Sequence, residues 1–388
     1  MTISPKKLNK WWSIAIGAGV ALSPIHNQWF TNLTTLPNGE VWFFLPKFAY
    51  IFIILGSGFF LLNNWEQVKA NGLGDRRVWI PLLVIVGAIG ISGITADGIQ
   101  AKFAPLGMGA ALFGLYLTAR IIGKSLFYPL AIGAAIGSVG IIVHQFAYPI
   151  KATGGFIFEN NFDIATGYIL LGAALFVHTR QWLLVGLAVV ALVLSGAPEA
   201  AFVLSVMAVV VVLRKDWSRR ATILASLLIV ALSVLMLSGQ ASRLYSYVGN
   251  SVNNDPVAHY TNPEGEERDV SPLAIRGLVI QDALTHIKPL GDGYNLTQFR
   301  VSTVHNVPLV VVQQLGYPGI LAGLAWLWVS IYCLVKTKWR YLFVLIFALS
   351  LFDHFIFTQL GVVWWLAVGV STAPNNIKSD LLFSSSDV

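Results

Sequence analysis

The chain has 388 residues, of which 56% are hydrophobic and only 11% are charged, and its mean hydropathy is +0.71. Soluble domains carry about 25% charged residues, so this composition excludes an ordinary soluble protein and indicates a polytopic membrane protein. The net charge of +7 is explained by Lys and Arg gathered in cytoplasmic loops, and no nucleic-acid partner is expected.

The cysteine and histidine residues argue against a metal centre. Cys333 is the single cysteine, so the chain can form neither an internal disulfide nor a cysteine-based zinc site. The seven histidines include no pair at the i, i+4 spacing of a helical zinc site. We therefore expect neither a metal nor another cofactor.

The apolar segments, taken in chain order, predict an all-α protein with about twelve transmembrane helices. The first follows Lys6, Lys7 and Lys10 and has the charge layout of a signal peptide, but we interpret it as a retained span because further spans follow and no small-x-small cleavage site is evident. The runs at 164–177, 181–196 and 359–371 are short, which leaves a re-entrant or interfacial helix as an alternative for one of them. All runs after the first lie near 41–63, 78–96, 104–123, 125–147, 164–177, 181–196, 198–213, 221–238, 316–335, 341–357 and 359–371.

The distribution of basic residues predicts the orientation. With the N-terminus inside, 17 of the 25 Lys and Arg residues fall in inner loops, and five of the other eight fall in one long outer loop at 239–306. Because Lys and Arg concentrate on the cytoplasmic side, both termini are expected in the cytoplasm of a multi-pass protein of the cytoplasmic (inner) membrane. Residues 1–388 then form one transmembrane domain with the external loop inserted, and the Ser-rich end at 372–388 is predicted to be a disordered cytoplasmic tail.

The outer loop divides into two parts. Residues 242–272 are turn-rich and hydrophilic and are predicted to be irregular. Residues 273–288 follow Pro272 and precede Pro289, and their apolar residues form one stripe of an amphipathic helix. Arg276 lies within that stripe. Its guanidinium either snorkels to water or faces a membrane cavity, where its planar fork suits a phosphate.

Other polar residues on the predicted outer face are also candidates. His305 and Asn306 stand at the entrance of an apolar segment, either as anchors of a helix end or as a base and a hydrogen-bonding group at the membrane surface. A buried Asp–His pair at a helix end is costly unless it is hydrogen-bonded or functional, which makes Asp353 and His354 candidates. Two loop residues complete the set, although polar loop residues are usually just solvated: Asn161 and Tyr294.

Four segments of the chain resemble the O-antigen ligase and polymerase family of polytopic membrane glycosyltransferases. The more specific two are RGLVIQDALTHIKPLGDGYNLTQF, which begins at Arg276, and HNVPLVVVQQLGYPGILAGLAWL, which begins at His305. The looser two are GGFIFENNFDIATGYILLGAALF and FDHFIFTQLGVVWWLAVG. The resemblance spans most of the chain and implies about twelve transmembrane helices with a large external loop over a lateral cavity that is open to lipid.

The resemblance also implies a donor and residue roles. Family members use a polyprenyl-diphosphate-linked glycan, with external arginines on the diphosphate and a loop histidine near the acceptor hydroxyl, which correspond here to Arg276 and His305. The family often has Ser-Arg-Gly at the outer start of a helix, but LSGAPEAAFVLSV places Pro198 and Glu199 there. Either a loop arginine supplies the second cation, or this chain handles its donor differently. The loop arginines concerned are Arg243, Arg268 and Arg300.

These observations lead to one hypothesis and one alternative. The hypothesis is a metal-independent glycosyltransferase of cell-envelope polysaccharide or lipopolysaccharide biosynthesis, which transfers a glycan from a carrier such as undecaprenyl diphosphate to a glycan, lipid or protein acceptor. Arg276 and a second cation would stabilise the leaving diphosphate, and His305 would accept or orient the acceptor proton. The alternative is a transporter or flippase for a lipid-linked or anionic solute. Membrane lipid is an expected partner in both cases.

Overall fold

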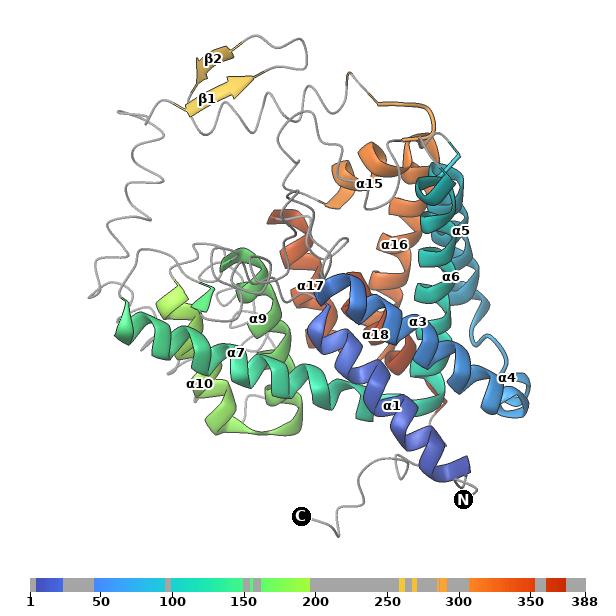
Figure 1. Ribbon diagram of the computed structural model, residues 1–388, viewed down its shortest axis with the longest axis horizontal. Coiled ribbons are helices and arrows are strands. Elements are labelled where there is room, and N and C mark those ends of the chain that lie inside the picture. Colours follow the sequence, from blue (N-terminus) through green and yellow to red (C-terminus); the bar gives the residue numbers. More distant parts are fainter. Residues whose placement is uncertain are drawn as a thin grey trace, which may run out of the picture.

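The computed structural model describes residues 5–23, 45–94, 99–148, 154–155, 162–195, 258–261, 267–270, 285, 287–291, 307–352 and 361–374. Within these ranges the chain is helical apart from connecting turns and one short hairpin, and the helices pack around a shared hydrophobic core (Figure 1). The helical class predicted from the apolar runs is confirmed for these residues.

Most helices coincide with predicted apolar runs, although their ends differ by a few residues. The run at 78–96 is α5, which begins two residues earlier because the Asp75 side chain caps it by accepting the Arg77 N–H at 2.9 Å. The predicted inner loop after 41–63 holds an unpredicted short helix, α4. The runs at 198–213 and 221–238 lie outside the described residues. The helices are α1 (Pro5–Leu22), α3 (Leu45–Asn63), α4 (Trp65–Asn71), α5 (Arg76–Ser92), α6 (Ile99–Ile122), the 3-10 helix η1 (Gly123–Leu126), α7 (Phe127–Ala147), α9 (Phe162–Thr179), α10 (Trp182–Ser195), α15 (Val307–Leu315), α16 (Tyr317–Lys336), α17 (Arg340–Phe352) and α18 (Gly361–Ser371).

Two helical segments among the described residues are long and apolar enough to cross a membrane, as judged by length and composition. They are Pro105–Ala147, which joins α6 to α7 through η1, and Tyr317–Lys336. Both turn large apolar side chains outward: Ile132 is 60% exposed and Leu321 is 61% exposed. Water disfavours such surfaces, whereas hydrocarbon matches them. The two segments suggest a membrane protein, while the number of spans and the cytoplasmic position of the termini remain predictions.

The helix α18, which was one of the short predicted runs, lies in the interior. Each residue from Gly361 to Val370 is buried, and eleven helical residues cover only about 16 Å. The indole N–H of Trp364 donates to the Ser330 hydroxyl of α16 at 3.0 Å, so the polar end of this tryptophan has a partner inside the core. The surrounding helices therefore enclose α18.

Polar contacts gather three basic helix ends at one end of the bundle. The buried Arg120 guanidinium, in the last turn of α6, donates to the Gly72 carbonyl at 2.8 Å in the α4–α5 connection and to the Thr372 carbonyl at 3.3 Å after α18. On α16, which carries Lys336 in its last turn, the Tyr332 hydroxyl donates to Asp75 at 2.6 Å. The start of α5 and the ends of α6 and α16 thus lie together, in keeping with the inner side predicted for their basic residues.

The stretch predicted to be irregular at 242–272 contains a β-hairpin, which corrects that prediction for its described part. Strands β1 (Ala258–Thr261) and β2 (Glu267–Val270) pair antiparallel, with Tyr260 opposite Arg268. The hairpin lies apart from the helices (Figure 1). Its strands are only four residues long and β2 has three charged residues in a row, so the hydrophobic alternation by which a strand is usually identified is weak here.

Candidate functional site

Most of the predicted site residues lie outside the described part of the chain. Arg268 is the exception, and its backbone belongs to β2, opposite Tyr260. The helix predicted at 273–288 lies outside except near its end, where Thr285 is helical and residues 289–290 form a turn, in agreement with an end at Pro289. The remaining predicted residues, none of them described, are Arg276, His305, Arg300, Arg243, Asn306, Tyr294, Asn161, Asp353 and His354.

The structure does show how the two specific sequence segments meet. Residues 287–291 form a turn in which the Gly291 N–H donates to the Lys288 carbonyl at 3.0 Å. The Tyr317 N–H, at the start of α16, donates to the Pro289 carbonyl at 2.9 Å. The turn therefore packs against the point where α15 ends and α16 begins. We call this contact the glycine junction and define it as residues 288–291 with 314–317.

Two glycines make the junction possible. Gly291 has φ +76° and Gly316 has φ +65°, a region in which residues with a Cβ are strained. A Cβ at Gly291 would meet the Gln314 carbonyl oxygen, and a Cβ at Gly316 would meet the Gly291 nitrogen and the Pro289 oxygen. Backbone thus packs directly on backbone from both sides. Gly316 also ends α15, and Pro318 follows in the first turn of α16, as is typical of such a break.

Buried residues anchor α15, the helix that leads into the glycine junction, in the hydrophobic core. On α15, Val310, Val311 and Leu315 are fully buried, and the Gln314 side chain is 1% exposed. The side-chain oxygen of the neighbouring Gln313 is buried without a hydrogen-bond partner among the described residues. Such an atom is costly unless a water or a ligand supplies a donor. The short helix that directly follows His305 and Asn306 is therefore fixed in the core and carries polar side chains.

Sequence reasoning missed Lys288 as a cation beside this site. Its side chain is exposed in the turn, close to the break between α15 and α16. The apolar stripe at 273–288 predicts only that Lys288 is the last residue of an amphipathic helix. Its position immediately before Pro289, a helix terminator, was the available signal that it would lie in a turn rather than on a helix face.

A second polar group lies at the opposite, basic end of α5 and α16. The Tyr332 hydroxyl first, and then the Arg77 backbone N–H, hold the pKa of Asp75 below its ordinary value. Asp75 is exposed, so this is a surface contact that orders a helix start rather than a buried catalytic pair. An aspartate just before Arg76 and Arg77 was the sequence signal for the cap.

A proline explains the neighbouring contact. Pro81 lies inside α5 and has no N–H, which leaves the carbonyl of Arg77, four residues earlier, without its helical partner. The Trp328 indole N–H of α16 donates to that carbonyl at 2.9 Å. In a membrane, a carbonyl freed by proline is commonly satisfied in this way by a neighbouring helix. The sequence alone could not identify the tryptophan that does so.

No protein-family model matches the chain, and no curated protein is significantly similar to it. The likeness to the O-antigen ligase and polymerase family therefore rests on the four quoted segments.

Proposed function

We propose that the protein is a membrane glycosyltransferase that moves a glycan from a polyprenyl-diphosphate carrier to an acceptor hydroxyl or amide at the outer face of the cytoplasmic membrane. The bond between the anomeric carbon and the diphosphate oxygen breaks, and the electron pair leaves with the diphosphate. The acceptor oxygen or nitrogen forms the new bond to that carbon and gives up its proton. No metal is required where arginine carries the electrostatic stabilisation.

The observation that carries the proposal is the glycine junction. It joins the middle of the segment that begins at Arg276 to the middle of the segment that begins at His305, through the 2.9 Å hydrogen bond from the Tyr317 N–H to the Pro289 carbonyl. These two segments are the ones that carry the family resemblance. Their contact supports a role for them in one site.

In the proposed mechanism Arg276 and a second cation bind the diphosphate and stabilise its growing charge. Arg243, Arg268 and Arg300 are the arginine candidates for the second cation, and the exposed Lys288 of the junction adds a fourth. His305 accepts or orients the acceptor proton, since imidazole titrates near neutral pH.

The test is transfer of lipid-linked glycan in membranes that contain Arg276→Ala or His305→Ala at wild-type protein levels. Each is expected to lower transfer by about 100-fold or more, the scale seen when one stabiliser of transition-state charge is removed. Arg276→Lys should recover only part of the activity, because a point charge replaces a planar fork. Lys102→Ala, at an exposed lysine on α6, is the control and should be fully active. Full activity in both alanine variants would refute the assignment.

The same preparation separates enzyme from transporter. Purified protein in proteoliposomes should form glycosylated product from the lipid-linked donor, and EDTA should not reduce the yield. Movement of the lipid-linked donor across the bilayer with no change in covalent structure would instead identify a flippase. In that case Arg276 would act as a substrate clamp.

A further inference from the structure

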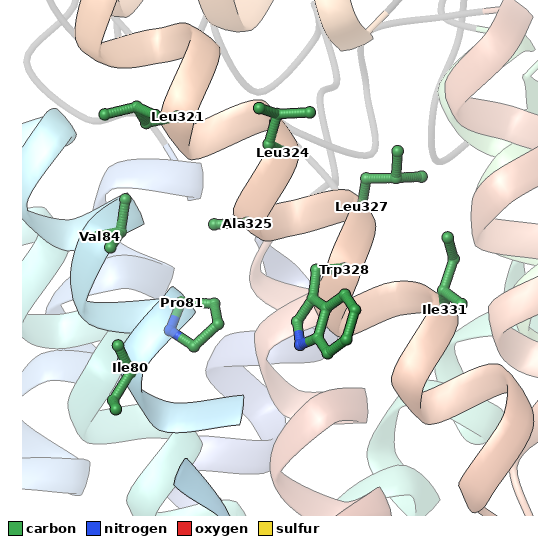
Figure 2. A pocket seen from close by; sticks show the side chains of 9 residues that line it. All are labelled: Ile80, Pro81, Val84, Leu321, Leu324, Ala325, Leu327, Trp328 and Ile331. Carbon is green, nitrogen blue, oxygen red and sulfur yellow. The ribbon is translucent and has the colours of Figure 1, made fainter. Parts of the chain in front are cut away.

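An apolar groove of about 600 Å³ lies between α5 and α16 (Figure 2). The side chains of α5 form one wall, those of α16 form the other, and every lining residue is apolar apart from one indole N–H. The groove is open, since Ile80 is 46% exposed and Leu324 is 58% exposed. The lining residues are Ile80, Pro81, Val84, Leu321, Leu324, Ala325, Leu327, Trp328 and Ile331.

The groove exists because small side chains lie between large ones. Ala325, which is 9% exposed, and Pro81 leave space between α5 and α16, while Leu321 and Leu324 project beside them (Figure 2). The hydrogen bond from the Trp328 indole to the Arg77 carbonyl fixes one end of the groove. The shape is thus set by packing and by a proline-related hydrogen bond.

Basic side chains lie just beyond the end of the groove that the Trp328 hydrogen bond fixes. Arg76 is one helical turn before Ile80 and Arg77 is one turn before Pro81, and both arginines are exposed. On α16, Lys336 lies just past Ile331 and is also exposed. Neither arginine side chain has a hydrogen bond or ion pair with another described residue. One end of the apolar groove is therefore bordered by three cations and by one carboxylate, that of Asp75, which accepts hydrogen bonds from the Tyr332 hydroxyl and the Arg77 backbone N–H.

The length of the groove matches one leaflet of a bilayer. From Leu321 to Ile331 the helix rises about 15 Å. The hydrocarbon core is about 30 Å thick, so the groove covers the depth of a single acyl chain. A chain lying in it would place its headgroup level with Arg76 and Arg77.

We propose that this groove binds one acyl chain of an anionic phospholipid, with the lipid phosphate at Arg76 and Arg77. The site is distinct from the proposed glycosyl-transfer site and does not depend on it. Charge complementarity favours this occupant over a second copy of the chain. A two-fold contact through this face would bring the same three cations of each copy to the same membrane depth, where they repel.

The experiment compares two lipids with identical tails. Purified protein is titrated with dioleoyl phosphatidylglycerol or dioleoyl phosphatidylcholine, and bound lipid is counted by native mass spectrometry. We expect phosphatidylglycerol to bind more tightly. Arg76→Gln with Arg77→Gln should weaken that binding about 30-fold, because each basic residue near an anionic headgroup contributes about fivefold. Both side chains are exposed, so the fold should be unaffected.

The control variant removes two charges elsewhere. Lys10→Gln with Lys102→Gln gives the same net charge, and both residues are exposed on α1 and α6; its lipid binding should stay within twofold of wild type. Phosphatidylglycerol with a photoreactive group in its tail should cross-link to the peptides containing Pro81 and Leu324.

Four results would each overturn the proposal. Three are equal binding of the two lipids, equal loss of binding in the two double variants, and cross-linking of the tail elsewhere on the chain. The fourth is a Leu324→Cys variant that forms a disulfide-linked dimer in lipid nanodiscs, which would assign the groove to a second copy.

Discussion

Replacing Gly316 with alanine places a methyl group where the glycine junction has no space for one. The new Cβ would meet the Gly291 nitrogen and the Pro289 oxygen, and it would lie 2.6 Å from the Lys288 oxygen. All three are backbone atoms of the docked turn. A flexible side chain could rotate away, but these atoms can separate only if the turn moves off α16.

Two contributions set the size of the effect. Gly316 has φ +65° and ψ −148°, a combination that is essentially restricted to glycine, and a residue with a Cβ held there costs about 1 to 3 kcal/mol. Displacing the turn loses the hydrogen bond between the Tyr317 N–H and the Pro289 carbonyl, which contributes about 1 kcal/mol. We therefore expect Gly316→Ala to destabilise the protein by about 2 to 4 kcal/mol, which corresponds to a Tm lower by several degrees.

The comparison variant is Gly87→Ala on α5, where nothing lies within 4 Å of an added Cβ. Alanine in a helix is favoured over glycine by roughly 0.5 to 1 kcal/mol, so this variant should melt at or above the wild-type temperature. Thermal unfolding of the purified proteins in one detergent gives the ranking.

A local measurement shows whether the turn itself has moved. Leu290→Cys places a thiol in the half-buried turn, and the native Cys333 is buried and should not react. Maleimide labelling of that thiol should be faster when Gly316→Ala is also present. Two results together would refute the structural reasoning about the junction. They are equal Tm values for Gly316→Ala and Gly87→Ala, and equal labelling rates of Leu290→Cys with and without Gly316→Ala.

The remaining predictions concern the basic end of α5 and α16. Trp328→Phe should destabilise the protein by about 1 kcal/mol, because it leaves the Arg77 carbonyl without its donor. In a Pro81→Ala background the N–H of residue 81 donates to that carbonyl, so Trp328→Phe should cost less. Thermal unfolding of the wild type, the two single variants and the double variant measures this coupling. Because the folded pKa of Asp75 is lowered, its contribution to stability is present above about pH 4 and is lost as the pH falls through the folded value. Tyr332→Phe removes the main cause of that lowering, so the variant should be less stable than wild type above about pH 4 and should lose less further stability as the pH falls. The difference in Tm between the two proteins should therefore narrow in acid, and identical Tm against pH curves would contradict this assignment.

Helix positions were largely readable from the sequence because burial in hydrocarbon or in a helical core requires continuous apolar runs. The run at 316–335 and the helix Tyr317–Lys336 differ by one residue at each end. Helix starts were less readable, since the start of α5 depends on one aspartate cap rather than on hydropathy. The hairpin at 258–270 was missed because its strands are only four residues long and β2 carries charges instead of alternating apolar residues.

The candidate site was readable only in part. The sequence identified the two segments that begin at Arg276 and His305, because their polar residues stand out in an apolar chain. It did not identify Gly316 as the partner of Gly291, since glycines 25 positions apart carry no sign of contact. It also could not show that Trp328 serves the carbonyl freed by Pro81, because that pairing depends on how two helices lie against each other.

The sequence by itself determined that the chain is apolar and helical, where most helices lie and where its polar residues gather, because these properties follow from local composition and periodicity. The tertiary structure decided which helix ends meet, which helix is enclosed and where the Pro-Leu-Gly turn docks. Those features depend on contacts between residues distant in the chain, and at the glycine junction they depend on the absence of two side chains. That absence becomes informative only when the neighbouring backbone is known.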